Sequence, residues 1–188
     1  ASQQTVTIDN FEDFITLLEF DKSTAYRLYH RQPREIIKLC QTSEQFLQLH
    51  KKNRDLAHSF YNNTPNHVIN LFQSHAQLIQ LLRECSSLAT QAYSNKPDHF
   101  IALLQNHQQF IELLTQDKSM AYKFYNRQPA KIIAMLQSFE AYLALMKADQ
   151  TIALHIVKFQ PNSIIGLIKS LRQLEQLNEQ NDVVVPYI

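Results

Sequence analysis

The sequence has almost no glycine: among its 188 residues the single glycine is Gly166. Loops that cradle phosphate groups need several glycines, because only glycine permits tight turns and a close approach of the backbone to a ligand. P-loop and dinucleotide-binding sites are therefore excluded. Alternating apolar and polar residues, the mark of half-buried strands, are also missing until the last few residues.

Cysteines and long apolar runs are scarce as well. The two cysteines, Cys40 and Cys85, form no motif, which argues against a disulfide framework and indicates a reducing compartment. No run of 18 or more apolar residues occurs, so we expect no membrane span. With 45% hydrophobic and 19% charged residues, the composition is typical of a folded domain with a sizeable core.

What the sequence does contain is an internal repeat of 32 residues. The prolines show it first, and alanine, leucine and isoleucine positions keep the same register, with tyrosine at a fifth position in four of the five copies. These positions are Pro33, Pro65, Pro97, Pro129 and Pro161; Ala25, Ala57, Ala89, Ala121 and Ala153; Leu17, Leu49, Leu81, Leu113 and Leu145; Ile37, Ile69, Ile101, Ile133 and Ile165; and Tyr29, Tyr61, Tyr93 and Tyr125. We expect the alanines to allow close helix contacts and the tyrosines to be core rings whose hydroxyls reach a carbonyl or a water.

Each repeat predicts three short helices. The first follows an Asp or Asn that suits a helix N-cap, and the second begins at the proline, which is favoured at the first helical position. The third follows a position that holds Asn, Thr or Ser in every copy, with Gln three residues later in several of them. An alternative joins the last two helices, so that residues 97–115 form a single helix.

We therefore predict an all-α fold, a superhelical solenoid of five 32-residue repeats over residues 14–173. Residues 1–13 are expected to form an N-terminal cap. Residues 174–188 are expected to form a C-terminal capping helix with an apolar tail that covers the open end of the stack. The whole is expected to be one structural domain.

No cluster of residues names a reaction, a metal or a cofactor. Histidines at equivalent positions of stacked repeats would lie roughly 10 Å apart, whereas metal–nitrogen bonds are only about 2 Å long. We expect Cys40 to lie in the core, and Cys85, which replaces a cap residue, to be partly exposed. Carboxylates are scattered without an acid/base pair, so the prediction is a protein that is not an enzyme and needs no cofactor.

The charge distribution suggests a candidate binding surface. Residues 14–173 hold all 18 Lys and Arg but 11 of the 17 acids, which makes the repeats basic by +7. The segments DKSTAYRLYHRQP (21–33) and DKSMAYKFYNRQP (117–129) repeat three basic positions, and further basic columns run through other repeats. The candidate surface residues are Lys22, Arg27, Arg31, Lys51, Arg54, Arg83, Lys118, Lys123, Arg127 and Lys147. The paired segments fit either a recent duplication or two similar ligand groups held three repeats apart.

The segments DLAHSFYNNTPNHVINLF (55–72) and SMAYKFYNRQPAKIIAML (119–136) resemble the mitochondrial transcription termination factor (mTERF) repeats. That resemblance covers residues 14–173 through apolar spacing and one proline per unit, and it implies nucleic-acid binding by a basic superhelix. The composition, rich in Gln, Asn and His, resembles that of host-directed effectors of intracellular bacteria. A cytoplasmic location follows, or the host-cell cytosol if the protein is a secreted effector.

The expected function is non-catalytic macromolecular binding, with a protein as the first choice of partner. Nucleic acid held by the basic columns is the alternative, and an oligomerisation module is the third possibility. Salt-sensitive binding would distinguish the second from the first, and a size that depends on concentration would reveal the third.

Overall fold

The computed structural model describes residues 6–181 and residue 186. The described residues form sixteen helices and no strand, which confirms the all-α prediction. None of the helices in this part of the chain is long and apolar enough to cross a membrane. The chain divides into two compact units, Ala1–Lys96 and Pro97–Ile188.

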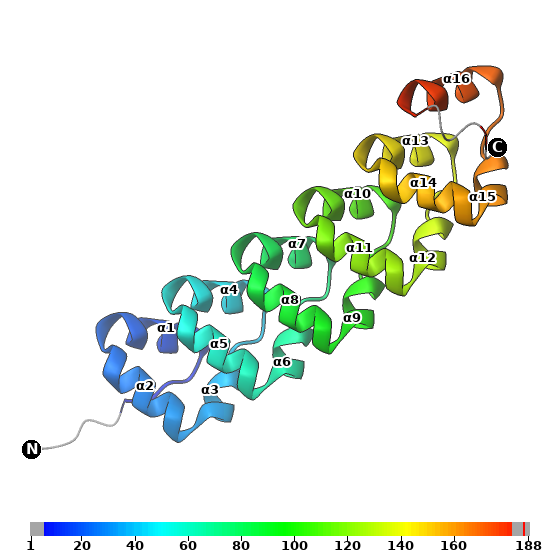
Figure 1. The fold of residues 1–188 in the computed structure, drawn as a ribbon. Coiled ribbons are helices and arrows are strands. Elements are labelled where there is room, and N and C mark those ends of the chain that lie inside the picture. The colour runs from blue at the N-terminus through cyan, green and yellow to red at the C-terminus, as the bar shows by residue number, and fades with distance from the viewer. Residues whose placement is uncertain (1–5, 182–185, 187–188) are drawn as a thin grey trace, which may run out of the picture. The chain divides into compact units, whose positions relative to one another are not determined.

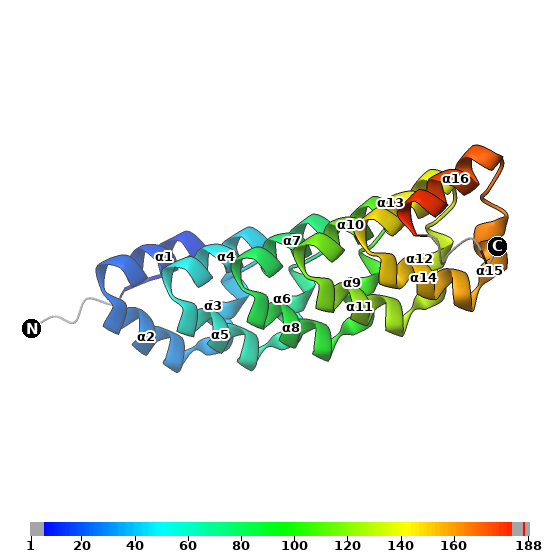
Figure 2. The ribbon, with the colours of Figure 1, turned by 45° about the horizontal axis from the view of Figure 1, so that its top comes forward.

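The first unit contains three hairpins of antiparallel helices joined by short proline-led helices. Its helices are α1 (Phe11–Phe20), α2 (Lys22–Arg31), α3 (Pro33–Leu39), α4 (Ser43–Lys52), α5 (Arg54–Asn63), α6 (Pro65–Asn70), α7 (His75–Glu84) and α8 (Ser86–Asn95). Within this unit α1, α4 and α7 lie in one row and α2, α5 and α8 in a second row (Figure 1). Both rows are visible again in the rotated view (Figure 2).

The second unit begins with a proline-led helix, contains two hairpins that are each followed by another proline-led helix, and ends with one more helix. Its helices are α9 (Pro97–Ala102), α10 (His107–Gln116), α11 (Lys118–Arg127), α12 (Pro129–Ala134), α13 (Phe139–Ala148), α14 (Gln150–Phe159), α15 (Pro161–Ile165) and α16 (Leu171–Gln180). In this unit α10 packs on α13 and α13 packs on α16, while α10 with α11 and α13 with α14 form hairpins.

The proline-led helix and the helix after it are separate, so the alternative of one helix over residues 97–115 is wrong. Helix α9 ends at Ala102 and α10 begins at His107. The break arises at Asn106, which is extended (φ −155°) and whose side chain accepts a hydrogen bond from the backbone N–H of Gln109 at 2.9 Å. A side chain that caps a helix start in this way favours a new helix over continuation of the old one.

The predicted cap boundaries fall inside helices. Helix α1 runs across the boundary at residue 13, and α16 begins at Leu171, before residue 174. Asn10 and Ser170 cap these two helices as Asn106 caps α10. Each side chain accepts a hydrogen bond from the backbone N–H three residues later. Most of the apolar tail, residues 182–185 and 187–188, lies outside the described residues.

The five alanines at the repeated position lie in the core of the two units. All five alanines have no exposed surface. The four tyrosines at the repeated position are also buried, at 1–7% exposure. These residues recur because helices of the hairpins approach closely there, and a larger side chain than alanine would overpack the contact.

Candidate functional site

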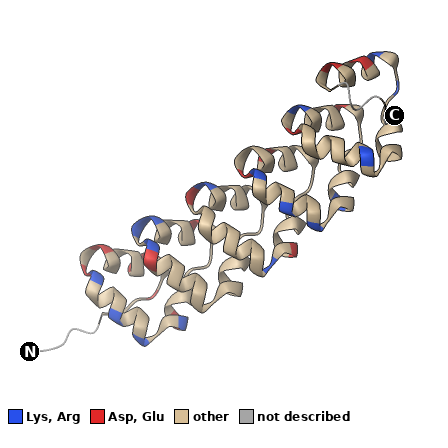
Figure 3. Ribbon diagram, in the orientation of Figure 1, with Lys and Arg blue, Asp and Glu red and all other residues tan. Residues whose placement is uncertain are grey.

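The ten basic residues proposed from the sequence are all exposed on helices. Helix α2 carries Lys22, Arg27 and Arg31; α4 carries Lys51; α5 carries Arg54; α7 carries Arg83; α11 carries Lys118, Lys123 and Arg127; and α13 carries Lys147. Figure 3 shows that Lys and Arg in each unit are interspersed with Asp and Glu.

Several of these cations are paired with an acid from a neighbouring repeat. Arg127 binds both carboxylate oxygens of Asp98, with Nε to Oδ1 at 2.8 Å and Nη2 to Oδ2 at 3.1 Å. Lys51 Nζ lies 2.9 Å from Glu84 Oε1. Such pairs neutralise charge locally and connect successive repeats, which reduces the cationic surface that is left for phosphate groups.

The lysines of the two similar segments have a structural role. Lys22 Nζ and Lys118 Nζ each lie 5.6 Å from the ring centre of the tyrosine four residues on, Tyr26 and Tyr122. This is cation–π geometry on one helix face. Lys118 Nζ also lies 3.7 Å from Asp149 Oδ2. The two segments therefore share an i, i+4 Lys–Tyr contact within one helix.

At the repeated tyrosine position, Tyr29, Tyr61 and Tyr125 make hydrogen bonds to side chains of the following repeat, whereas the sequence predicted carbonyl or water partners. Asn63 Nδ2 donates to the Tyr29 hydroxyl at 2.7 Å, and Asn95 Nδ2 donates to the Tyr61 hydroxyl. The Tyr125 hydroxyl lies 2.6 Å from His155 Nδ1. Burial raises the pKa of Tyr125 and, against the opposing bond from Asn95, that of Tyr61. Each of these hydroxyls therefore forms a hydrogen bond between two successive repeats.

The second unit contains an open crevice of about 490 Å³, bordered by the segment between α9 and α10, by α12 and the segment after it, and by the starts of α10 and α13. Its lining combines the amide side chains of Gln105 and Gln137 with the apolar Ala134 and Met135. One lysine lines it, Lys131, whose Nζ donates to the carbonyl oxygen of Ile101 at 2.6 Å. Burial lowers the pKa of this lysine. The crevice is thus nearly uncharged, and none of the ten basic residues chosen from the sequence lines it.

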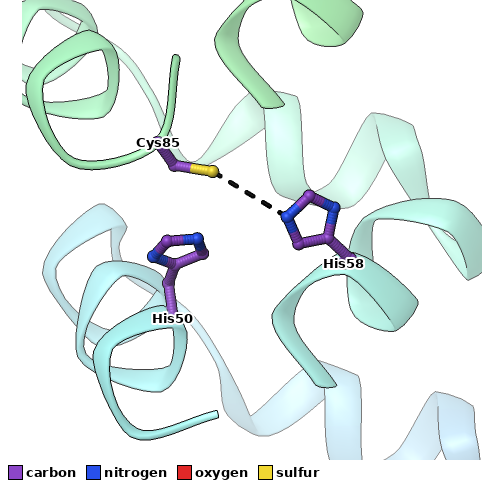
Figure 4. Close-up of side chains that lie close together, drawn as sticks. All are labelled: His50, His58 and Cys85. Carbon is purple, nitrogen blue, oxygen red and sulfur yellow. Dashed lines mark hydrogen bonds between the residues drawn. The ribbon is translucent and has the colours of Figure 1, made fainter. Parts of the chain in front are cut away.

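A group of side chains that the sequence analysis missed lies in the first unit. His50 of α4, His58 of α5 and Cys85, between α7 and α8, point toward one another (Figure 4). Their ligand-capable atoms all lie within 4.8 Å of one another, and Cys85 Sγ is 4.0 Å from His58 Nε2. Cys85 is 5% exposed, so the expectation of a partly exposed cysteine is wrong, whereas Cys40 is in the core as predicted.

The electrostatics of this cluster favour neutral imidazole at His50. Burial lowers the pKa of His50 first, the neighbouring charges of His58 and Arg54 lower it further, and Glu84 opposes them. The sequence analysis compared only histidines at equivalent positions of the repeat. The cluster instead combines residues from three different positions of the repeat. No fixed spacing along the sequence predicts that such residues lie close together.

No protein-family model matches this sequence, and searches of curated proteins and of solved structures found no similar protein. The resemblances to mTERF repeats and to bacterial effectors therefore stay predictions.

Proposed function

We propose that this chain is a non-catalytic binding scaffold, a solenoid of five helical repeats whose partner is another protein. The recurrent residues support the scaffold part of the proposal, since the alanine and tyrosine positions pack in the core and most of the helix-cap positions form caps. Repeat proteins of this kind bind through side chains outside the repeated core. The three helices per repeat and their regular spacing along the chain fit this architecture.

The observation that carries the choice of a protein partner is the crevice of the second unit. Amide side chains such as those of Gln105 and Gln137 pair with the backbone N–H and C=O groups of an extended peptide, while Ala134 and Met135 offer apolar contact. A volume of about 490 Å³ is of the size that accommodates a few side chains. We propose a short segment of low net charge as the bound element.

Nucleic acid is the weaker alternative, although the mTERF resemblance implies it. A phosphate-binding surface needs cations that are available to replace counterions. Here Arg127, Lys51 and Lys118 are close to acids of neighbouring repeats. The lining of the crevice adds only Lys131, which is already bonded to a carbonyl oxygen.

The proposal is tested by selecting short random peptides on the full chain and measuring their affinity by fluorescence anisotropy. We expect selected peptides of low net charge, and a loss of affinity of at least about tenfold when Ala134→Arg places a cation in the crevice. The matched control is Ala102→Arg. Ala102 occupies the same repeat position, is likewise exposed at the end of its proline-led helix, and does not line the crevice.

Labelled DNA and RNA are measured beside the peptides at about 50 and 200 mM salt. Tight nucleic-acid binding that weakens steeply with salt, together with failure of the peptide selection, would overturn the protein partner. Equal loss of peptide affinity in both arginine variants would show that the crevice is not where the peptide binds.

A further inference from the structure

The cluster of His50, His58 and Cys85 is made of three departures from the repeat pattern. At the position of His50 the other repeats have the buried apolar residues Leu18, Leu82, Leu114 and Met146. At the position of Cys85 they have the helix-cap residues Asp21, Asn53, Asp117 and Asp149. At the position of His58 they have Tyr26, Thr90, Tyr122 and Leu154. The repeat pattern therefore does not account for any of these three residues. Their side chains nevertheless lie close together.

At two of these three positions, those of Cys85 and His50, a polar group lacks a hydrogen bond. The side chains of Asp21, Asn53, Asp117 and Asp149 each accept a backbone hydrogen bond at a helix start, but Cys85 makes no such cap for α8. His50 Nε2 is buried and has no hydrogen-bond partner among the described residues. A buried polar nitrogen without a partner is unfavourable, because it has lost its hydrogen bonds to water without gaining one in the protein. A ligand for that nitrogen removes this penalty.

The donor set indicates which ligand. One thiolate and two neutral imidazoles are the ligands that zinc prefers, with Zn–S near 2.3 Å and Zn–N near 2.0–2.1 Å. In a tetrahedral site these bond lengths separate sulfur from nitrogen by about 3.6 Å. Cys85 Sγ and His58 Nε2 are 4.0 Å apart, so a shift of a few tenths of an ångström brings them to bonding geometry.

The surrounding charge is mixed, and one acid favours a cation. Glu84 and Arg54, which carry opposite charges, both interact electrostatically with His50. Glu84 Oε2 is buried without a hydrogen-bond partner in the described part of the chain, although Oε1 is paired with Lys51. Glu84 Oε2, on the residue before Cys85, is therefore a second buried atom without a hydrogen-bond partner beside the cluster.

We propose that His50, His58 and Cys85 form a zinc-binding site in the first unit, with three protein ligands and a fourth position open to water or a partner's ligand. Coordination would connect the α4–α5 hairpin to the junction between α7 and α8, and so link successive repeats.

The test uses the full chain, purified with chelator and a thiol reductant and then freed of both by desalting under inert gas. Zn²⁺ is titrated by calorimetry, and Co²⁺ is titrated by absorption, because a cobalt–thiolate bond gives a charge-transfer band. We expect one ion per chain, a band that the Cys40→Leu variant keeps, and a higher unfolding temperature with Zn²⁺. In the Cys40→Leu variant Cys85 is the single thiol, so the band reports on that residue.

The ligand variants take their replacements from other repeats, which preserves the fold. They are His50→Leu, His58→Tyr and Cys85→Asn, and each is expected to lower zinc affinity by more than about 100-fold. The matched control, His30→Asn, removes an exposed histidine of the same unit and should bind zinc as the parent chain does. Circular dichroism of every metal-free variant reports whether it is folded.

Absence of zinc binding by the folded parent chain would overturn the proposal. Undiminished binding by all three folded ligand variants would do the same, as would binding of Cu⁺ without binding of Zn²⁺.

Discussion

Tyr122 and Asp149 join two successive repeats of the second unit through one hydrogen bond and one helix cap. The Tyr122 hydroxyl donates to Asp149 Oδ2 at 2.8 Å, while Asp149 Oδ1 accepts from the backbone N–H of Ile152 at 3.1 Å. The same link of 27 residues occurs in the first unit, where Asn53 Nδ2 donates to the Tyr26 hydroxyl at 2.7 Å. His58 and Cys85 occupy these two positions at the zinc site proposed above.

Replacing Tyr122 with Phe should destabilise the second unit. The variant keeps the ring but leaves one oxygen of a carboxylate that is 4% exposed without its donor. We expect a loss of about 1–2 kcal/mol in the free energy of unfolding, measured by urea denaturation. Lys123→Gln, an exposed change on the same helix, is the control and should have little effect. An unchanged denaturation midpoint in Tyr122→Phe would show that this link does not stabilise the unit.

Enlarging an alanine of the repeated core should be more damaging than the same change at the surface. Ala121 has no exposed surface, so Ala121→Leu overpacks the helix contact and should reduce stability by about 1–3 kcal/mol. Ala148 is exposed at the end of α13, and Ala148→Leu should change stability by no more than about 0.5 kcal/mol. Thermal and urea unfolding of both variants measure the difference. Equal effects would contradict the packing role of the alanine position.

The Asp98 carboxyl should titrate below its ordinary pKa of 3.8. Hydrogen bonds from Arg127 and then Gln128 lower the pKa of Asp98. Because the folded pKa is the lower one, any stability from this pair is present above pH 3.8 and is lost as the pH falls through the folded value. Carboxyl chemical shifts measured by NMR should give a midpoint that rises toward 3.8 in Arg127→Gln. Lys123→Gln should leave it in place, and an unshifted midpoint in Arg127→Gln would refute the pairing.

The Cys40 thiol should resist alkylation while the protein is folded. Burial raises the pKa of Cys40 to about 12, so very little reactive thiolate exists at pH 8. The Cys85→Asn variant leaves Cys40 as the single thiol, and its labelling by iodoacetamide can be followed by mass spectrometry. We expect labelling to be slow in buffer and fast in denaturant. Labelling at the denatured rate in buffer would show that Cys40 is accessible.

Most of the helix starts and ends could be predicted from the sequence, because their determinants are local, whereas the choice between two and three helices per repeat was decided by the structure. Prolines mark the starts of short helices, and residues such as Asn106 and Thr42 cap the next ones through side chains that reach only three residues along the chain. The buried positions of Ala121 and Tyr125 followed from the same regularity, since apolar residues that recur at helical spacing in successive repeats face the shared core.

Contacts between repeats were decided only by the tertiary structure. The pairing of Arg127 with Asp98 and the meeting of His50, His58 and Cys85 depend on how far one hairpin is shifted and rotated against the next. Comparing equivalent positions of the repeats does not reveal this shift and rotation, because the side chains in contact come from different positions of the repeat. The sequence by itself therefore determined which residues cap, pack and end each helix. Packing of one hairpin on another determined which exposed cations are paired with acids and where three potential metal ligands come together.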